Sequence, residues 1–197
     1  MIFEDLLISY GADYKKYRTN DIIFAEGENP SFYYQILDGK VKINNYNDQG
    51  KEFIQRILSV GEIIVVTALF IDRPYPMNAV VIEDCKVIRL PKQNFFNLLS
   101  RRPEFYTKFL KYISESMYYK HIMMQTLSFQ KPENRLKTLM NYLKEKQEEQ
   151  SPFSFQVPYT RQQLASLTGL SVETVIRVTK LMEKNDDLKI KNRKIFY

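Results

Sequence analysis

The 197-residue sequence contains one cysteine, one histidine and no tryptophan. A disulfide needs two thiols, so Cys85 alone excludes an intrachain disulfide, and it also excludes an all-cysteine metal site within one chain. No apolar run approaches the ~20 residues of a membrane-spanning helix, and the first residues, MIFEDLLI, carry acids where a secretory leader would carry bases. The sequence therefore predicts a cytoplasmic protein that has neither a metal site nor a membrane partner.

Positive charge is unevenly distributed along the chain. Residues 131–197 carry 13 basic and 8 acidic side chains, a net charge of +5, whereas the first 130 residues carry 16 basic and 15 acidic side chains, a net charge of +1. A basic segment attracts polyanions. The hydrophobic content of 44% is enough for a sizeable core, and the length favours two domains. A polyanionic partner is therefore expected at the carboxyl-terminal domain.

Residues 19–91 alternate apolar and polar side chains between turn glycines, a pattern typical of short strands. The predicted strands are Ile22–Ala25, Ser31–Leu37, Lys40–Asn45, Lys51–Leu58, Met77–Ile82 and Lys86–Leu90. The pair Asp38–Gly39 favours a hairpin turn between two of them. After a short helix at Ile2–Ser9, the pattern predicts an antiparallel barrel or jelly roll.

From residue 93 the periodicity becomes helical, with a short helix at Gln93–Leu99 and a long helix from about Glu104. Seven residues of the long helix recur by threes and fours as a heptad seam: Tyr106, Leu110, Ile113, Met117, Lys120, Met124 and Leu127. Such a seam favours self-association into a homodimer, and a second stripe, Phe105, Phe109 and Tyr112, is expected to pack on the barrel. The alternative is a helix that packs only on its own barrel.

The segment YTRQQLASLTGLSVETVIRVTKLM, residues 159–182, has the pattern of two short helices joined by a tight turn. Thr160 is expected to cap the first helix with Gln163 reaching back to its amide, and Ser171 is expected to cap the second. Gly169 suits the left-handed residue between them. These fixed offsets predict a helix-turn-helix whose second helix buries Val175, Val178, Leu181 and Met182.

The opposite face of this second helix presents Val172, Glu173, Ile176, Arg177 and Lys180. An arginine there can bond guanine O6 and N7, and a glutamate can accept from cytosine N4. The alternative is a surface ion pair between residues four apart. Around the motif, we expect a helix at Glu133–Lys146, a short strand at Phe153–Val157 and a basic hairpin at Leu188–Tyr197 that turns at Asn192.

The order of these elements resembles the Crp/Fnr family of bacterial transcription regulators. The resemblance depends on FAEGE at 24–28, YYQILDGKVKI at 33–43, VGE at 60–62 and YTRQQLASLTGLSVETVIRVTKLMEK. It implies an α+β fold with a sensor β-roll at 1–103, a dimerisation helix and hinge at 104–130, and a winged helix-turn-helix at 131–197. It also implies a twofold dimer on palindromic double-stranded DNA, with RNA polymerase as a further partner.

By this resemblance, Thr160, Arg161 and Gln162 bond the DNA backbone, while Glu173 and Arg177 read the inner G·C pair of a TGA-like half-site. The expected DNA-contacting residues are Thr160, Arg161, Gln162, Ser171, Val172, Glu173, Thr174, Ile176, Arg177, Lys180, Arg193 and Lys194. Val172 stands where cyclic-AMP-binding members have a third base-reading arginine, so the outer base of the half-site is left open.

The resemblance places the effector pocket at Val65, Val66, Thr67, Met77, Asn78, Lys120 and His121. Val65 and Val66 replace a Gly-Glu pair, and Met77 and Asn78 replace the arginine and hydroxyl residue that bind the cyclic phosphate. Because a buried phosphate needs a cationic partner, the sequence argues against cyclic AMP.

Other familiar effectors also lack their ligands in the sequence. An iron–sulfur cluster needs several amino-terminal cysteines, and a haem would have Cys85 and His121 as its only candidates. The effector is thus unidentified, with effector-independent action or redox sensing through Cys85 as alternatives. A cupin-like enzyme is not expected because residues 1–120 contain no histidine. A pure sensor or scaffold module would leave the basic hairpin without a role.

Overall fold

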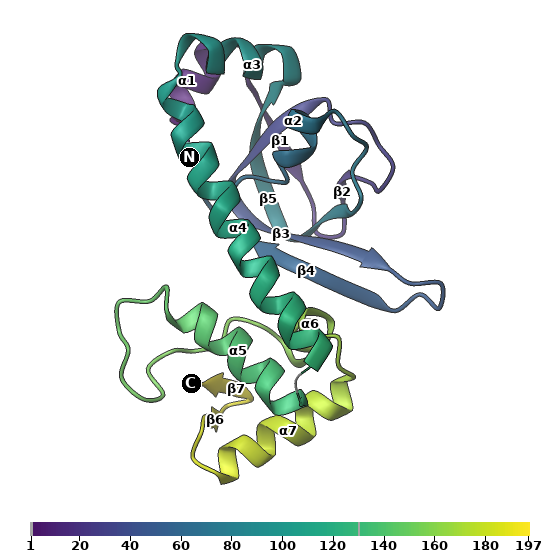
Figure 1. Ribbon diagram of the computed structural model, residues 1–197, viewed down its shortest axis with the longest axis vertical. Helices are drawn as coiled ribbons and strands as arrows, with labels where there is room; N and C mark the ends of the chain where they lie inside the picture. Colours follow the sequence, from purple (N-terminus) through teal and green to yellow (C-terminus); the bar gives the residue numbers. More distant parts are fainter. Residues whose placement is uncertain (1, 130) are drawn as a thin grey trace. The chain divides into compact units, whose positions relative to one another are not determined.

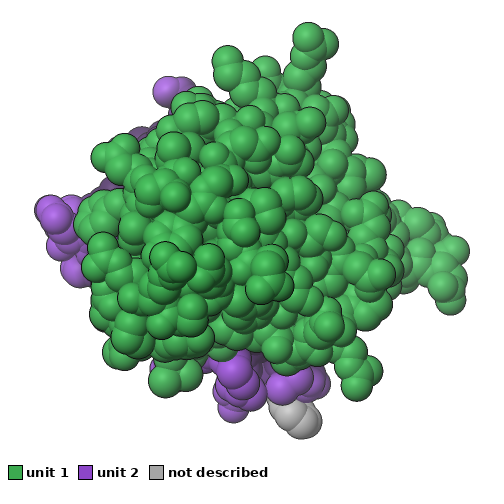
Figure 2. Space-filling view, turned by 90° about the horizontal axis from the view of Figure 1, so that it is seen from above, with its two compact units in different colours: residues 1–115 green, residues 116–197 purple. Residues whose placement is uncertain are grey.

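The computed structural model describes residues 2–129 and 131–197 (Figure 1). The chain divides into two compact units, Met1–Glu115 and Ser116–Tyr197, which are coloured separately in Figure 2. The boundary falls inside the long helix α4 (Glu104–Phe129), so this helix contributes to both units. Gln130, which ends the predicted dimerisation and hinge segment, lies outside the described residues.

The amino-terminal unit is built on a five-stranded antiparallel sheet, which confirms the predicted fold class. Along the sheet the order is β1-β5-β3-β4, and β2 also pairs with β5. The strands are β1 (Asp13–Tyr17), β2 (Ile22–Phe24), β3 (Phe32–Tyr46), β4 (Glu52–Leu58) and β5 (Asn78–Pro91). The two long strands β3 and β5 form the centre, and their pairing shifts register at three places between Ile36 and Val41.

The hairpin predicted at Asp38–Gly39 is wrong, because both residues lie inside the continuous strand β3. Gly39 has φ +83°, and a Cβ at this position would lie 2.2 Å from the carbonyl oxygen of Asp84 on β5. The glycine therefore permits a close approach of two backbones at a bulge, instead of a reversal of the chain. The two strands predicted at Met77–Ile82 and Lys86–Leu90 are likewise one continuous strand, β5.

Three helices cover one end of the sheet (Figure 1): α1 (Glu4–Ser9), α3 (Lys92–Arg101) and the first turns of α4. Phe105 and Phe109 of α4 are buried in this core, and the hydroxyl of Tyr112 donates to the carbonyl oxygen of Ile63 at 2.7 Å. The predicted packing of this second stripe on the sheet domain is confirmed. A one-turn helix, α2 (Thr67–Ile71), was not predicted.

The carboxyl-terminal unit adds three helices and a small hairpin to the second half of α4: α5 (Pro132–Lys144), α6 (Arg161–Thr168), α7 (Val172–Lys184), β6 (Lys189–Lys191) and β7 (Lys194–Phe196). Its core includes Leu136, Met140, Leu164, Val175 and Met182. The strand predicted at Phe153–Val157 is wrong: this segment makes an isolated bridge between Gln156 and Phe196. Among the described residues, no helix is long and apolar enough to cross a bilayer.

Candidate nucleic-acid interface

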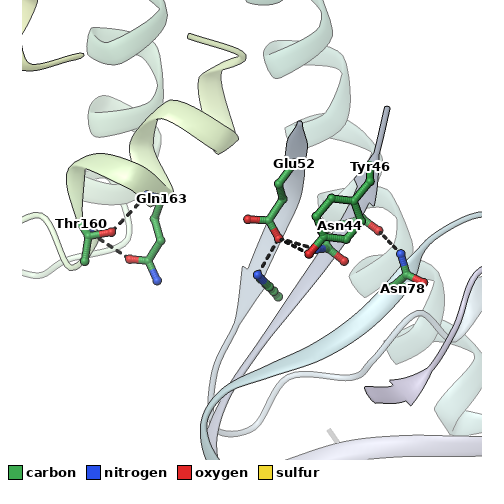
Figure 3. Close-up of polar contacts among 7 residues, drawn as sticks. Asn44, Tyr46, Glu52, Asn78, Thr160 and Gln163 are labelled. Atoms are coloured by element: carbon green, nitrogen blue, oxygen red, sulfur yellow. Dashed lines mark hydrogen bonds and ion pairs between the residues drawn. The ribbon is translucent and has the colours of Figure 1, made fainter. Parts of the chain in front are cut away.

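The amino-terminal end of α6 is closed by a capping box between Thr160 and Gln163 (Figure 3). The amide of Gln163 donates to Thr160 Oγ1 at 3.1 Å, and the amide of Thr160 donates to Gln163 Oε1 at 2.9 Å. Two backbone donors that would otherwise lack partners are thereby satisfied. The predicted cap is confirmed, and it leaves the exposed side chain of Gln162 in the first turn of the helix.

The turn between α6 and α7 also has the predicted form. Gly169 takes the left-handed conformation with φ +68°, and the amide of Leu170 donates to the carbonyl of Ala165 at 3.0 Å. Ser171 then caps α7 by accepting from the amide of Thr174 at 3.2 Å, and its hydroxyl also contacts that of Thr174 at 3.1 Å. The hydroxyls of Ser171 and Thr174 therefore already stabilise the start of α7.

The buried face of α7 consists of Val175, Val178, Thr179 and Met182. Leu181, which was expected to be buried, is 47% exposed, so this prediction is wrong. Positions 175, 178, 179 and 182 lie within one stripe of the helix, and position 181 lies outside that stripe. The polar Thr179 is accepted in the core because its hydroxyl donates to the carbonyl of Val175 at 2.8 Å.

The outward face of α7 presents Glu173, Ile176, Arg177 and Lys180 to solvent, with Val172 half-buried at its start. Among the described residues, no ion pair joins Glu173 to Arg177, although they are four residues apart. The backbone amide of Glu173 itself and the hydroxyl of Ser171 hold the pKa of the Glu173 carboxyl below its usual value. At neutral pH the face therefore carries an anionic acceptor and cationic donors, which matches the edges of a G·C pair.

The hairpin β6–β7 ends in a two-residue turn at Asn192 and Arg193, both with positive φ. One guanidinium nitrogen of Arg161, at the start of α6, donates to the carbonyl of Arg193 at 2.8 Å. Burial lowers the pKa of Arg161 from its usual high value, but the group stays cationic at neutral pH. This bond joins residues 32 positions apart and was not predicted, because no local sequence pattern indicates it. The bond holds the hairpin against α6.

Within the amino-terminal unit, the residues expected to line an effector pocket divide between two core clusters and the surface. Val65 and Met77 pack in the same core cluster, whereas Val66 belongs to the second cluster and Thr67 is exposed. Val65 has φ +44°, a strained conformation for a β-branched residue. Two further expected residues, Lys120 and His121, are exposed on α4 in the other compact unit.

The positions matched to the cyclic-phosphate pair do not fit a cyclic nucleotide. Met77 is buried, and Asn78 uses both ends of its amide inside the sheet domain. Its Oδ1 accepts from the amide of Glu26 at 2.9 Å, and its Nδ2 donates to the carbonyl of Asn44 at 3.3 Å (Figure 3). Neither side chain carries the charge that a buried phosphate requires.

Cys85 is buried within β5, and burial raises the pKa of its thiol to about 11. The reactive species of a cysteine is the thiolate, so this thiol is unreactive at neutral pH. Among the described residues, no group of three or more histidine, cysteine, aspartate or glutamate side chains is arranged to hold a metal ion.

The predicted dimer seam on α4 is mostly exposed. Tyr106, Leu110, Met117 and Met124 are between 46% and 66% exposed, and Lys120 is also exposed. The other two seam residues differ: Ile113 packs in part against the amino-terminal core, and Leu127 lies beside Gly169. The exposed apolar members recur along α4, with Tyr106 and Leu110 in one compact unit and Met117 and Met124 in the other.

Comparison with known proteins gives matches in both units. A model of the cyclic nucleotide-binding domain matches residues 14–102, and a model of the Crp-like helix-turn-helix domain matches residues 134–196. The cAMP-activated global transcriptional regulator CRP of Haemophilus influenzae is 26% identical over 171 residues, 85% of this chain and 76% of that protein. The fumarate and nitrate reduction regulatory protein of Vibrio cholerae is 25% identical over 175 residues, 88% of this chain and 70% of that protein.

Two solved structures share the fold. The c-di-GMP responsive global regulator CLP of Xanthomonas campestris aligns with a TM-score of 0.80 at 20% identity, over 98% of both chains. A CooA mutant of Carboxydothermus hydrogenoformans aligns with a TM-score of 0.84 at 16% identity, over 100% of this chain and 87% of that one. Since the two domain models between them account for both compact units, the chain belongs to the Crp/Fnr family and is a transcription regulator with a helix-turn-helix DNA-binding domain.

Proposed function

We propose that this protein binds a palindromic duplex as a homodimer and reads each half-site with α7. The observation that carries the proposal is the outward face of α7, where Glu173 and Arg177 are exposed and not paired with each other. A helix that buries one face and leaves such donors and acceptors on the other is suited to the major groove. Arg177 is assigned to guanine and Glu173 to cytosine of one G·C pair.

Around this face, several groups are suited to the DNA backbone. The exposed side chains of Thr160 and Gln162 flank the start of α6, where backbone amides favour anions. Arg193 and Lys194 are exposed at the tip of the β6–β7 hairpin. Contacts of this kind set position and register on a duplex, while the base contacts of α7 set sequence preference.

The exposed apolar residues of α4 support dimerisation and therefore a twofold site. This apolar stripe, which includes Leu110, Met117 and Met124, has the spacing of a coiled-coil seam. A twofold dimer places two recognition helices in major grooves about 34 Å apart, one turn of B-DNA. The two half-sites are accordingly inverted copies of one sequence.

The control of binding is proposed to differ from that of cyclic-AMP-activated relatives. Met77 and Asn78 offer no cation to a cyclic phosphate, and the amide of Asn78 is already engaged. The redox alternative through Cys85 is not proposed, because that thiol is buried and its pKa is raised to about 11. Addition of cyclic AMP is therefore expected to leave DNA binding unchanged.

Selection from a random duplex library with the full chain tests the proposal. We expect enrichment of an inverted repeat with half-site centres 10 to 11 base pairs apart. The selected duplex should bind at least about a thousandfold more tightly than random DNA at physiological salt. Enrichment of an unsymmetrical sequence would reject the twofold arrangement, and equal affinity for every duplex would reject sequence-specific binding.

A further inference from the structure

The outward face of α7 carries two parallel ridges. Glu173 and Arg177, four residues apart, form a polar ridge, and Val172 and Ile176, also four apart, form an apolar ridge beside it. Ile176 is 41% exposed, although isoleucine is among the residues most often found buried. An apolar, β-branched side chain is thus held in solvent next to the pair assigned to a G·C base pair.

The packing of the carboxyl-terminal unit does not account for Ile176. The core side of α7 is already made by Val175, Val178, Thr179 and Met182, and Ile176 lies on the other side of the helix. Its neighbours on the exposed face are charged, including the cations Arg177 and Lys180. These cations favour a polyanion, and not an apolar protein surface, as the partner of this face.

We propose that Ile176 contacts the 5-methyl group of a thymine that neighbours the G·C pair read by Glu173 and Arg177. This inference rests on the proposed function and deepens it by naming a second recognised base. In the major groove thymine alone presents a methyl group at C5, so an apolar side chain distinguishes it from the other bases. Because β-branched side chains are stiff at χ1, Ile176 loses little rotamer freedom when the contact forms.

The effect of this contact on binding affinity can be estimated from the burial of one methyl group. Burial of one methyl group changes an equilibrium constant about fourfold, which corresponds to ~0.8 kcal/mol. Deoxyuridine differs from thymidine only in lacking this methyl group and keeps every hydrogen-bonding group of the base edge. Replacing the relevant thymine by deoxyuridine should therefore weaken binding of the full chain about fourfold per half-site.

The experiment compares thymine and uracil versions of the selected duplex, with one thymine replaced at a time in both half-sites. Wild-type protein should lose affinity at one position adjacent to the recognised G·C pair. Ile176→Ala should bind the thymine duplex more weakly and should bind the two versions nearly equally. Leu181→Ala is the matched control, because Leu181 is similarly exposed on α7 but lies one helical turn beyond Arg177, farther from the start of the helix; it should keep the wild-type ratio.

The outcomes separate this inference from the proposed function. A thymine-to-uracil loss of the same size in wild type and Ile176→Ala would overturn the assignment of Ile176. A wild-type protein indifferent to uracil at every thymine would overturn the methyl contact, while Arg177→Ala would still test the G·C contact. Failure to select any preferred duplex would overturn both. Far-UV circular dichroism and binding to random DNA establish that each variant is folded.

Discussion

At the scale of single residues, the cations of the carboxyl-terminal unit fall into two groups. Lys137 lies 3.0 Å from Glu133 and 2.9 Å from Asp187, and Lys189 pairs with Asp186. Other exposed cations have no acidic partner among the described residues, and they include Arg177, Lys180, Arg193 and Lys194. The first group stabilises the unit, and the second is available to phosphates and bases.

Lys194→Ala tests this division. Each phosphate neutralised by a lysine contributes about one unit to the slope of log affinity against log salt concentration. The variant should bind matched and random duplexes more weakly by a similar factor, and its salt slope should fall by about one unit. Lys189→Ala is the control, because its ammonium group is engaged by Asp186 and lies over the ring of Phe153. An unchanged salt slope in Lys194→Ala would show that Lys194 does not contact a phosphate of the DNA.

Cys85 provides a second prediction at this scale. Its pKa is raised by burial to about 11 from an ordinary value of 9.0, so the folded chain keeps the proton across this range. Folded protein should react slowly with iodoacetamide at pH 8 and rapidly in denaturant. Between pH 9 and 11 the folded state binds more protons than the unfolded state. The free energy of unfolding therefore falls as the pH rises through that window. Rapid alkylation of the folded protein would show an accessible thiolate.

At the scale of elements, the helix-turn-helix could be predicted closely because its signals are local. Caps at Thr160 and Ser171 and the left-handed Gly169 set both helix starts and the turn between them. Strand β1 was missed because four of its five residues are exposed, so no alternation marks it. Lysines on such a strand suit the edge of a sheet. The bond from Arg161 to Arg193 could not be predicted, since it depends on tertiary placement.

Gly39 shows how a local turn signal can mislead, and it makes a prediction. Gly39→Ala should unfold the amino-terminal unit or destabilise it by several kcal/mol, because its Cβ would meet the backbone of Asp84 and Cys85. Gly50→Ala is the matched control: its φ is also positive, at +73°, but nothing lies within 4 Å of the added Cβ. It should cost about 1 kcal/mol. Urea unfolding measures the free energy of unfolding of both variants. Equal losses would mean that the backbones of β3 and β5 move apart to admit the added Cβ.

At the scale of the whole molecule, α4 carries two apolar stripes along its length of about 39 Å. One side of its first turns packs Phe105 and Phe109 into the amino-terminal core, and its apolar seam stays exposed at Leu110 and Met117. Ile113, although part of the seam, packs in part against that core. A change at Ile113 would therefore disturb folding as well as self-association, and Leu110 is the better position for a test.

Leu110→Glu should convert the proposed homodimer to a monomer in sedimentation equilibrium, because two buried carboxylates would face each other across the predicted seam. Leu110 is 66% exposed, so the fold of one chain should be kept. Lys111→Glu introduces a carboxylate on the same helix away from the seam and should remain dimeric. A Leu110→Glu protein that is still dimeric would show that the dimer interface lies on another surface of the chain.

The central claim is that Arg177 reads a G·C pair, and a four-way comparison of affinities tests it most directly. Wild type and Arg177→Ala are titrated, at one salt concentration, with the selected duplex and with a duplex whose most sensitive G·C pair is replaced by A·T in both half-sites. The account predicts that wild type loses about 1 to 3 kcal/mol per half-site on replacement and that Arg177→Ala binds both duplexes equally. Undiminished discrimination by Arg177→Ala would contradict it.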